Sequence, residues 1–157
     1  MTGKQPGSIG CFICGRENPV GLKMDFYNTG PGEVRAELTL PVHYEGYPGV
    51  VHGGIIAAIL DETGGRAHMN DPNHFMVTAQ LNVRYRAPVP TETPLVAYGK
   101  AGEKRGRVSK SHAELRNFEG EVLADAELVL VDIPEEQLEN VDPVEMGWRV
   151  YPDEEAR

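Results

Sequence analysis

One stretch of eleven residues combines bare backbone with adjacent carboxylates, at a spacing that suits chemistry on a carbonyl group. It reads His52-Gly53-Gly54-Ile55-Ile56-Ala57-Ala58-Ile59-Leu60-Asp61-Glu62. A helix that begins at the two glycines leaves its first N–H groups without partners inside the helix, and together with the helix dipole they favour an anion. The oxyanion that forms when a carbonyl is attacked is such an anion. Gly53 and Gly54 are therefore candidate donors, and Asp61 is a candidate base or nucleophile.

The apolar residues of this stretch recur at helical spacing and predict a helix over 53–67. Its predicted core face holds Ile55, Ile56, Ile59, Leu60 and Thr63. Asp61 falls on the other side, where its neighbours are all small: Gly54, Ala57, Ala58, Gly64 and Gly65. Another backbone or a slender ligand can approach such a face closely. The alternative is a buried helix whose small face only packs on a neighbouring element.

The two ends of this helix are too far apart to act on one bond within one chain. Eight residues separate Gly53 from Asp61, or about 12 Å at a rise of about 1.5 Å per residue. A catalytic group must lie about 3 Å from its target. If both groups serve one carbonyl, the donor comes from one subunit and the carboxylate from its twin. This predicts a two-fold homodimer with antiparallel helices and two equivalent sites, and leaves assembly into a dimer of dimers open.

Composition bounds the class of protein. At 157 residues with a formal net charge of −9, the chain is long enough for one domain, and its charge argues against binding to nucleic acid or to an anionic membrane. No apolar run approaches the roughly 20 residues that a membrane-spanning helix needs. Residues 1–10 have no apolar segment typical of a signal peptide. We therefore expect a cytoplasmic protein without a membrane partner.

Positive charge is concentrated in one segment. Residues 84–110 hold seven basic and two acidic side chains, a local charge of +5, whereas residues 132–157 hold nine acidic and two basic ones. A small basic patch on an acidic protein suits a compact polyanion such as a phosphorylated cofactor. The alternative is that these are solvated charges that discourage aggregation at strand edges.

The chain divides into a polar segment 1–10, predicted to be disordered, a folded domain over 11–132 and an acidic tail over 133–157. Alternating apolar residues predict strands before and after the helix, and a short helix is expected in the tail: strands 22–27, 34–40, 77–86, 94–103, 107–117 and 121–131, and helix 135–140. In the strand 77–86, Val77 and Leu81 share one predicted face and Thr78 lies on the other. The order predicts an α+β fold with an antiparallel sheet wrapped around one long helix.

Several motifs together resemble the hotdog-fold acyl-CoA thioesterases of the phenylacetyl-CoA thioesterase type. The likeness spans residues 11–131 and rests on the following segments: Cys14-Gly15, Asn18-Pro19-Val20-Gly21-Leu22, 46–54, Leu60-Asp61-Glu62, Val77-Thr78, 82–90 and Gly106-Arg107. The resemblance implies hydrolysis of a fatty or aromatic acyl-CoA to acid and CoA, with no metal and no cofactor beyond the CoA of the substrate.

The resemblance also assigns roles to residues. The N–H of Gly53, helped by Gly54, would hold the thioester oxygen, and Asp61 of the partner subunit would activate water or attack directly. Thr78 would orient the water beside that carboxylate. The basic residues implied for the CoA phosphates are Lys104, Arg105 and Arg107.

One position departs from the family pattern. Many relatives carry an asparagine six residues before the histidine of His-Gly-Gly, and this chain has Gly46 there, with His43, Glu45 and Tyr47 nearby. The departure keeps a second hypothesis open, a hotdog protein that binds acyl-CoA without cleaving it. Hydratases of the same fold use an Asp and His pair that is not found at the expected places.

Four other side chains carry competing interpretations. His52 is a candidate substrate-binding residue, but a histidine just before a helix more often fixes the loop. Glu62 is expected to pair with a basic side chain. Cys11 and Cys14 have the spacing of a metal or redox pair, yet supply only two of the four ligands that zinc takes. We expect cysteines that pack, with a small zinc or redox protein as the third hypothesis.

Overall fold

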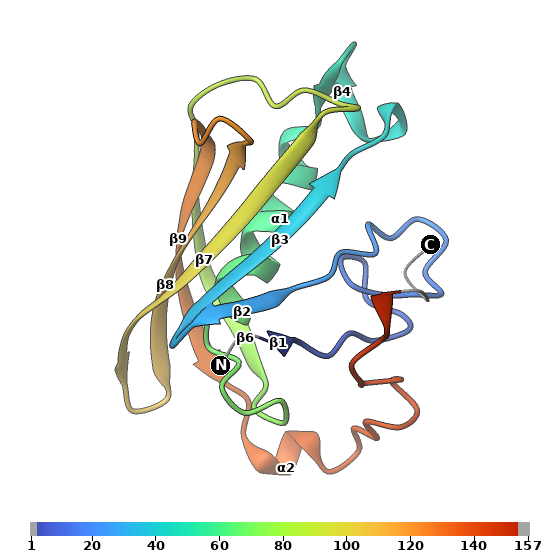
Figure 1. Cartoon of the computed structure of the whole chain (residues 1–157). Helices are drawn as coiled ribbons and strands as arrows, with labels where there is room; N and C mark the ends of the chain where they lie inside the picture. Colours follow the sequence, from blue (N-terminus) through green and yellow to red (C-terminus); the bar gives the residue numbers. More distant parts are fainter. Residues whose placement is uncertain (1–2, 154–157) are drawn as a thin grey trace.

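A single long helix, α1 (Gly53–Arg66), lies against the concave side of a curved sheet in the computed structural model, which describes residues 3–153 (Figure 1). The helix begins and ends within a residue of the prediction, since His52 caps its first turn and Ala67 follows its last. No helix of the described residues has both the length and the apolar character needed to cross a membrane.

The sheet is antiparallel throughout and has seven strands in the order β1-β2-β3-β7-β8-β9-β6. Its strands are β1 (Gly3–Lys4), β2 (Tyr27–Gly30), β3 (Glu33–Thr39), β6 (Met76–Tyr85), β7 (Pro94–Arg105), β8 (Val108–Asn117) and β9 (Val122–Asp132). A 3₁₀ turn (Val42–Tyr44) and a small hairpin of β4 (Glu45–Tyr47) and β5 (Val50–Val51) lead into α1. The predicted α+β architecture is confirmed.

Glycine lets α1 approach the sheet closely at two points. A Cβ on Gly99 of β7 would lie 2.4 Å from the carbonyl oxygen of Thr63, and one on Gly64 would lie 2.5 Å from Leu128. Around these contacts the predicted core face of α1 is buried at Ile56, Ile59, Leu60 and Thr63, whereas Ile55 is only partly buried. Gly64, however, does not belong to the open small-residue face, because the sheet covers it.

The first predicted strand is wrong in its position. Residues 22–26 do not join the sheet, and the strand in this region, β2, begins only at Tyr27. Lys23 has a positive φ of 53°, a conformation that interrupts a regular strand. The alternating Met24 and Phe26 are nevertheless buried, because backbone bonds to Phe12 and Ile13 hold this segment against the core.

A bulge in β6 reverses the predicted face of Thr78. The register with β9 shifts between Thr78 and Gln80, so that Thr78 pairs with Leu130 and Leu81 pairs with Leu128. Both partners are buried on the helix side. Thr78 therefore faces α1 together with Leu81, and Val77 is 53% exposed. An extra residue in a strand changes which side chains share a face, and the alternation of the sequence did not reveal it.

The two ends of the chain pack on each other beside α1. Residues 3–10, predicted to be disordered, are held in place: β1 pairs with β2, and Gly7 forms a bridge with Arg149 in the tail. The tail begins with the expected short helix, α2 (Glu135–Leu138), and then passes beside the N-terminal segment (Figure 1). Residues 1–2 and 154–157 lie outside the described residues.

Candidate active site

The N-terminal end of α1 presents one free backbone donor. The Nδ1 atom of His52 accepts the N–H of Gly54 at 2.9 Å, and the carbonyl of His52 accepts the N–H groups of Ile55 and Ile56. The N–H of Gly53 has no hydrogen-bond partner among residues 3–153. Gly54 is thus engaged by the cap, which argues against its predicted help to Gly53. His52 has the positional role expected of a histidine before a helix.

Tyr85, at the end of β6, fixes the first residue of the helix. Its hydroxyl donates to the carbonyl of Gly53 at 2.7 Å. A Cβ on Gly53 would contact the Tyr85 ring at 3.4 Å, an ordinary van der Waals distance. The Tyr85 ring is half exposed, so this end of α1 is open to solvent in the single chain.

Asp61 and Thr78 meet at the other end of β6. The Thr78 hydroxyl donates to a carboxylate oxygen of Asp61 at 2.6 Å. No basic side chain within residues 3–153 forms an ion pair with Asp61, whereas its neighbour Glu62 pairs with Arg66 at 2.8 Å. Glu62 therefore has the structural partner predicted for it. The second carboxylate oxygen of Asp61 has no hydrogen-bond partner within residues 3–153.

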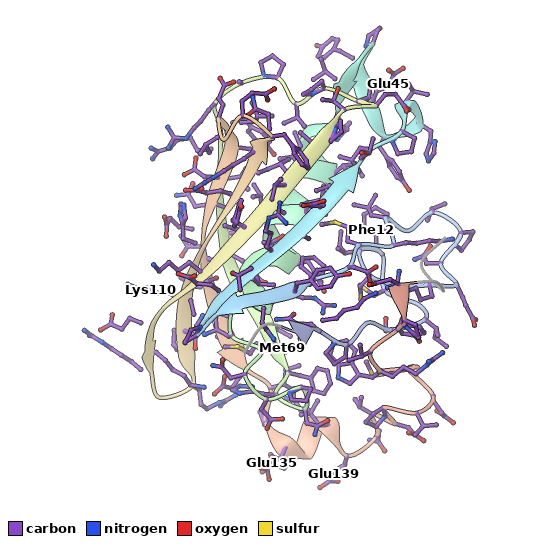
Figure 2. The ribbon with its side chains drawn as sticks, in the orientation of Figure 1. Phe12, Glu45, Met69, Lys110, Glu135 and Glu139 are labelled. Carbon is purple, nitrogen blue, oxygen red and sulfur yellow. The ribbon has the colours of Figure 1, made fainter. Side chains whose placement is uncertain are left out.

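Asp61 and Thr78 line a pocket of about 270 Å³. Its apolar and sulfur-bearing lining comes from segments far apart in the sequence: Cys11, Cys14, Met69, Phe75, Met76, Leu130, Met146 and Trp148. Met69 lies just beyond the C-terminal end of α1, where these segments converge (Figure 2). The pocket suits an apolar group placed beside the Asp61 carboxylate.

Arg66 and Trp148 line this pocket, and neither was among the residues predicted for the site. Arg66 is 3% exposed; it donates to the carbonyl of Pro6 at 2.6 Å and stacks on the rings of Phe26 and Trp148. Its Nη2 atom is buried without a hydrogen-bond partner. Trp148 is the one tryptophan of the chain and lies in a tail otherwise rich in acids, which was the available signal.

The two cysteines line this pocket, and Cys14 is buried. A hydrogen bond from the Cys11 thiol lowers the pKa of Cys14 to about 6, although burial opposes this, and Arg66 adds a smaller lowering. The same hydrogen bond, with burial, raises the pKa of Cys11 above its ordinary value.

The basic residues predicted to meet phosphates lie at the β7–β8 hairpin and are exposed, but most are already paired. Lys104 bridges Asp132 at 3.0 Å, Arg105 bridges Glu103 at 2.6 Å, and Arg107 donates to the carbonyl of Asp132 at 3.0 Å. The predicted local charge of +5 counted only residues 84–110. Asp132 of β9, which lies outside that segment, pairs with Lys104 and so reduces the free positive charge. His74, which lines the pocket beside Asp61, also bonds Asp132 at 2.7 Å.

Gly46 stands where a side chain would have little room. A Cβ there would lie 3.3 Å from the Cα of His52. Of the neighbours that the sequence offered as substitutes, Glu45 accepts the N–H of Gly49 at 2.9 Å and Tyr47 is 80% exposed. His43 stacks on the adjacent Tyr44. None of the three contacts Asp61.

Comparison with known proteins gives the family context. Residues 48–124 match the model of the thioesterase superfamily. The rat (Rattus norvegicus) acyl-coenzyme A thioesterase THEM4 is 33% identical over 82 residues, which are 52% of this chain and 35% of that protein. The THEM4 of Xenopus laevis is 29% identical over 98 residues, 62% of this chain and 44% of that protein. The chain thus spans well under half the length of these relatives.

Solved structures share the fold. The thioesterase superfamily protein RHA08564 is 33% identical with a TM-score of 0.72, over 77% of this chain and 62% of that one. A thioesterase superfamily protein from Shewanella loihica is 27% identical with a TM-score of 0.59, over 71% of this chain and 91% of that one.

Proposed function

We propose that this chain, whose residues 48–124 match the thioesterase superfamily and whose fold is shared with its solved structures, hydrolyses an acyl-CoA thioester, with each active site at the interface of a homodimer. The observation that carries the proposal is the position of two contacts at opposite ends of β6. Thr78 bonds Asp61 at one end, and Tyr85 bonds the Gly53 carbonyl at the other.

The free edge of β6 supports the dimer. Among the described strands β6 pairs only with β9, so the backbone groups of its other edge have no strand partner. Exposed edges of this kind pair readily with another chain. Two-fold antiparallel pairing about a point midway between Thr78 and Tyr85 would set each Thr78 opposite Tyr85 of the partner subunit. Asp61 would then come close to Gly53 of the partner subunit.

The chemistry follows from these groups. The thioester oxygen accepts the free N–H of Gly53, which stabilises the negative charge that develops on it. Asp61 of the partner subunit, oriented by Thr78, removes a proton from water or attacks the carbonyl itself. The apolar pocket beside Asp61 receives the acyl group, and the CoA phosphates extend towards Lys104, Arg105 and Arg107. The products are the free acid and CoA.

Subunit complementation tests the interface. Asp61→Asn removes the base and Gly53→Pro removes the N–H donor, so each homodimer loses activity. In a mixed dimer, one of the two sites combines the intact Gly53 of one chain with the intact Asp61 of the other. Random mixing of equal amounts should restore about a quarter of the thiol release of wild type. If the mixture stays as inactive as either variant, a site within a single chain replaces the proposed one.

A second candidate function is acyl-CoA binding without hydrolysis, which the crowded backbone at Gly46 favours. A panel of acyl-CoAs separates the two. The binding protein would be established if the wild-type dimer bound an acyl-CoA tightly without releasing CoA. Wild type and Asp61→Asn would then also show equal rates of thiol release.

A further inference from the structure

A third metal-binding donor joins the two cysteines in the folded chain. The Sγ atoms of Cys11 and Cys14 and a carboxylate oxygen of Glu62 all lie within 4.8 Å of one another. Two ligands of a tetrahedral zinc ion, with Zn–S near 2.3 Å and Zn–O near 2.1 Å, lie about 3.5 Å apart. The cluster thus needs only small movements to close around an ion.

The loop that carries the cysteines is built to hold them in this arrangement. The Cys11 sulfur accepts the backbone N–H groups of Ile13 at 3.3 Å and Cys14 at 3.4 Å. Gly15 closes the turn by donating to the Cys11 carbonyl at 2.8 Å, and a Cβ on it would lie 2.2 Å from that oxygen. Hydrogen bonds of this kind orient metal ligands and hold their charge.

Glu62 and Arg66 complete the charge balance. Arg66 binds one carboxylate oxygen of Glu62, which leaves the second oxygen for a ligand. Two thiolates and one carboxylate carry −3, and Arg66 reduces this to −2. A divalent cation brings the sum to zero, which favours its binding at a site where Cys14 is 2% exposed and Arg66 is 3% exposed.

We propose that Cys11, Cys14 and Glu62 bind a zinc ion, with a water molecule from the adjoining pocket as the fourth ligand. Thiolate ligands favour zinc among the common divalent ions, and the pocket that all three residues line provides the entry path. The ion fastens the N-terminal segment to α1 one residue from Asp61. Its ligands differ from the reacting groups of the proposed hydrolysis, Gly53 and Asp61, although both sites open on the same pocket.

Metal content and affinity test the site. Full-length protein purified without chelators should hold one zinc per chain by elemental analysis. Cobalt added to metal-free protein should give thiolate-to-metal charge-transfer absorption. Zinc should also raise the melting temperature in proportion to the logarithm of its concentration, since it binds only the folded site.

Three variants and one control complete the experiment. We expect at least a tenfold loss of zinc affinity for each of three variants: Cys11→Ser, Cys14→Ser and the milder Glu62→Gln. Even the loss of a group that only hydrogen-bonds a metal ligand commonly weakens metal binding about tenfold. Asp61→Asn lines the same pocket and should bind zinc as wild type does. Circular dichroism confirms that each variant is folded. Wild type that binds no zinc, or cysteine variants that bind it with unchanged affinity, would overturn the proposal.

Discussion

The two ends of α1 use glycine and polar groups in opposite ways. At the N-terminal end, Gly53 leaves an N–H free and stays open to solvent beside Tyr85. At the C-terminal end, Gly64 is buried against Leu128, and the surroundings of Asp61 are enclosed by both terminal segments of the chain. One end leaves a backbone donor exposed, whereas packing at the other end surrounds a carboxylate and the pocket beside it. The difference teaches that glycine content alone does not mark a site; its surroundings do.

The largest expected effect comes from the donor at the open end. Gly53→Pro removes the N–H at the first helical position, where proline is tolerated, and His52 already has the extended conformation that a following proline requires (φ −59°, ψ 135°). We expect kcat for thioester hydrolysis to fall about 10²–10³-fold. Gly53→Ala keeps the N–H and is the matched control. Equal activity of the two variants would remove Gly53 from the mechanism.

The next effect concerns the enclosed end. Thr78→Val keeps the strand and the volume but deletes the hydrogen bond to Asp61. A hydrogen bond to a charged group contributes about 1.5–3 kcal/mol, so kcat/KM should fall about 10–100-fold, while Thr78→Ser retains most activity. A Thr78→Val enzyme as fast as wild type would show that this hydroxyl has no positioning role.

The third prediction concerns the stability of the fold at Gly64, in contrast to the activity expected to depend on Gly53. A methyl group at Gly64 meets Leu128 at 2.5 Å, and overpacking of this kind costs about 1–3 kcal/mol. Gly64→Ala should therefore lower the free energy of unfolding by a similar amount, less the gain in helix propensity. Denaturant titration measures the loss. The rate of hydrolysis per folded enzyme should equal that of wild type. A fall in kcat without a loss of stability would contradict the contrast between a buried Gly64 and an exposed Gly53.

The smallest effect lies away from both ends, on the outer face of the sheet. Burial opposes protonation of His112, but hydrogen bonds to Glu114 and Glu127 outweigh it and raise its pKa above the ordinary value of about 6.5. The stabilisation is complete below that ordinary value and is lost as the pH rises through the raised pKa. Because solvent screens the pairs, His112→Gln should remove less than about 1 kcal/mol. Denaturant titrations of wild type and His112→Gln, at a pH below the ordinary pKa and at a pH above the raised one, check the direction of this effect. A stability difference between the two proteins that grows as the pH rises would refute it.

Much of the fold could be predicted because its signals are local. The helical spacing of Ile56, Ile59 and Leu60 marks the buried face of α1, and alternation over 94–131 marks three strands of the sheet. The candidate site was predicted in outline by Gly53 and Asp61, through motifs and helix geometry. Its division between two subunits stays a proposal, supported by the free edge of β6.

The sequence by itself determined α1, its buried face and most of the strands, since side-chain periodicity within a helix or strand depends on neighbouring residues. Tertiary structure alone decided what depends on distant segments. The register of β6 against β9 turned Thr78 towards Asp61. The meeting of the N-terminal segment with α1 placed Cys11 and Cys14 beside Glu62. Neither contact leaves a trace in local spacing, because Asp61 and Thr78 lie 17 residues apart along the chain, Cys14 and Glu62 lie 48 apart, and each pair meets only when the chain is folded.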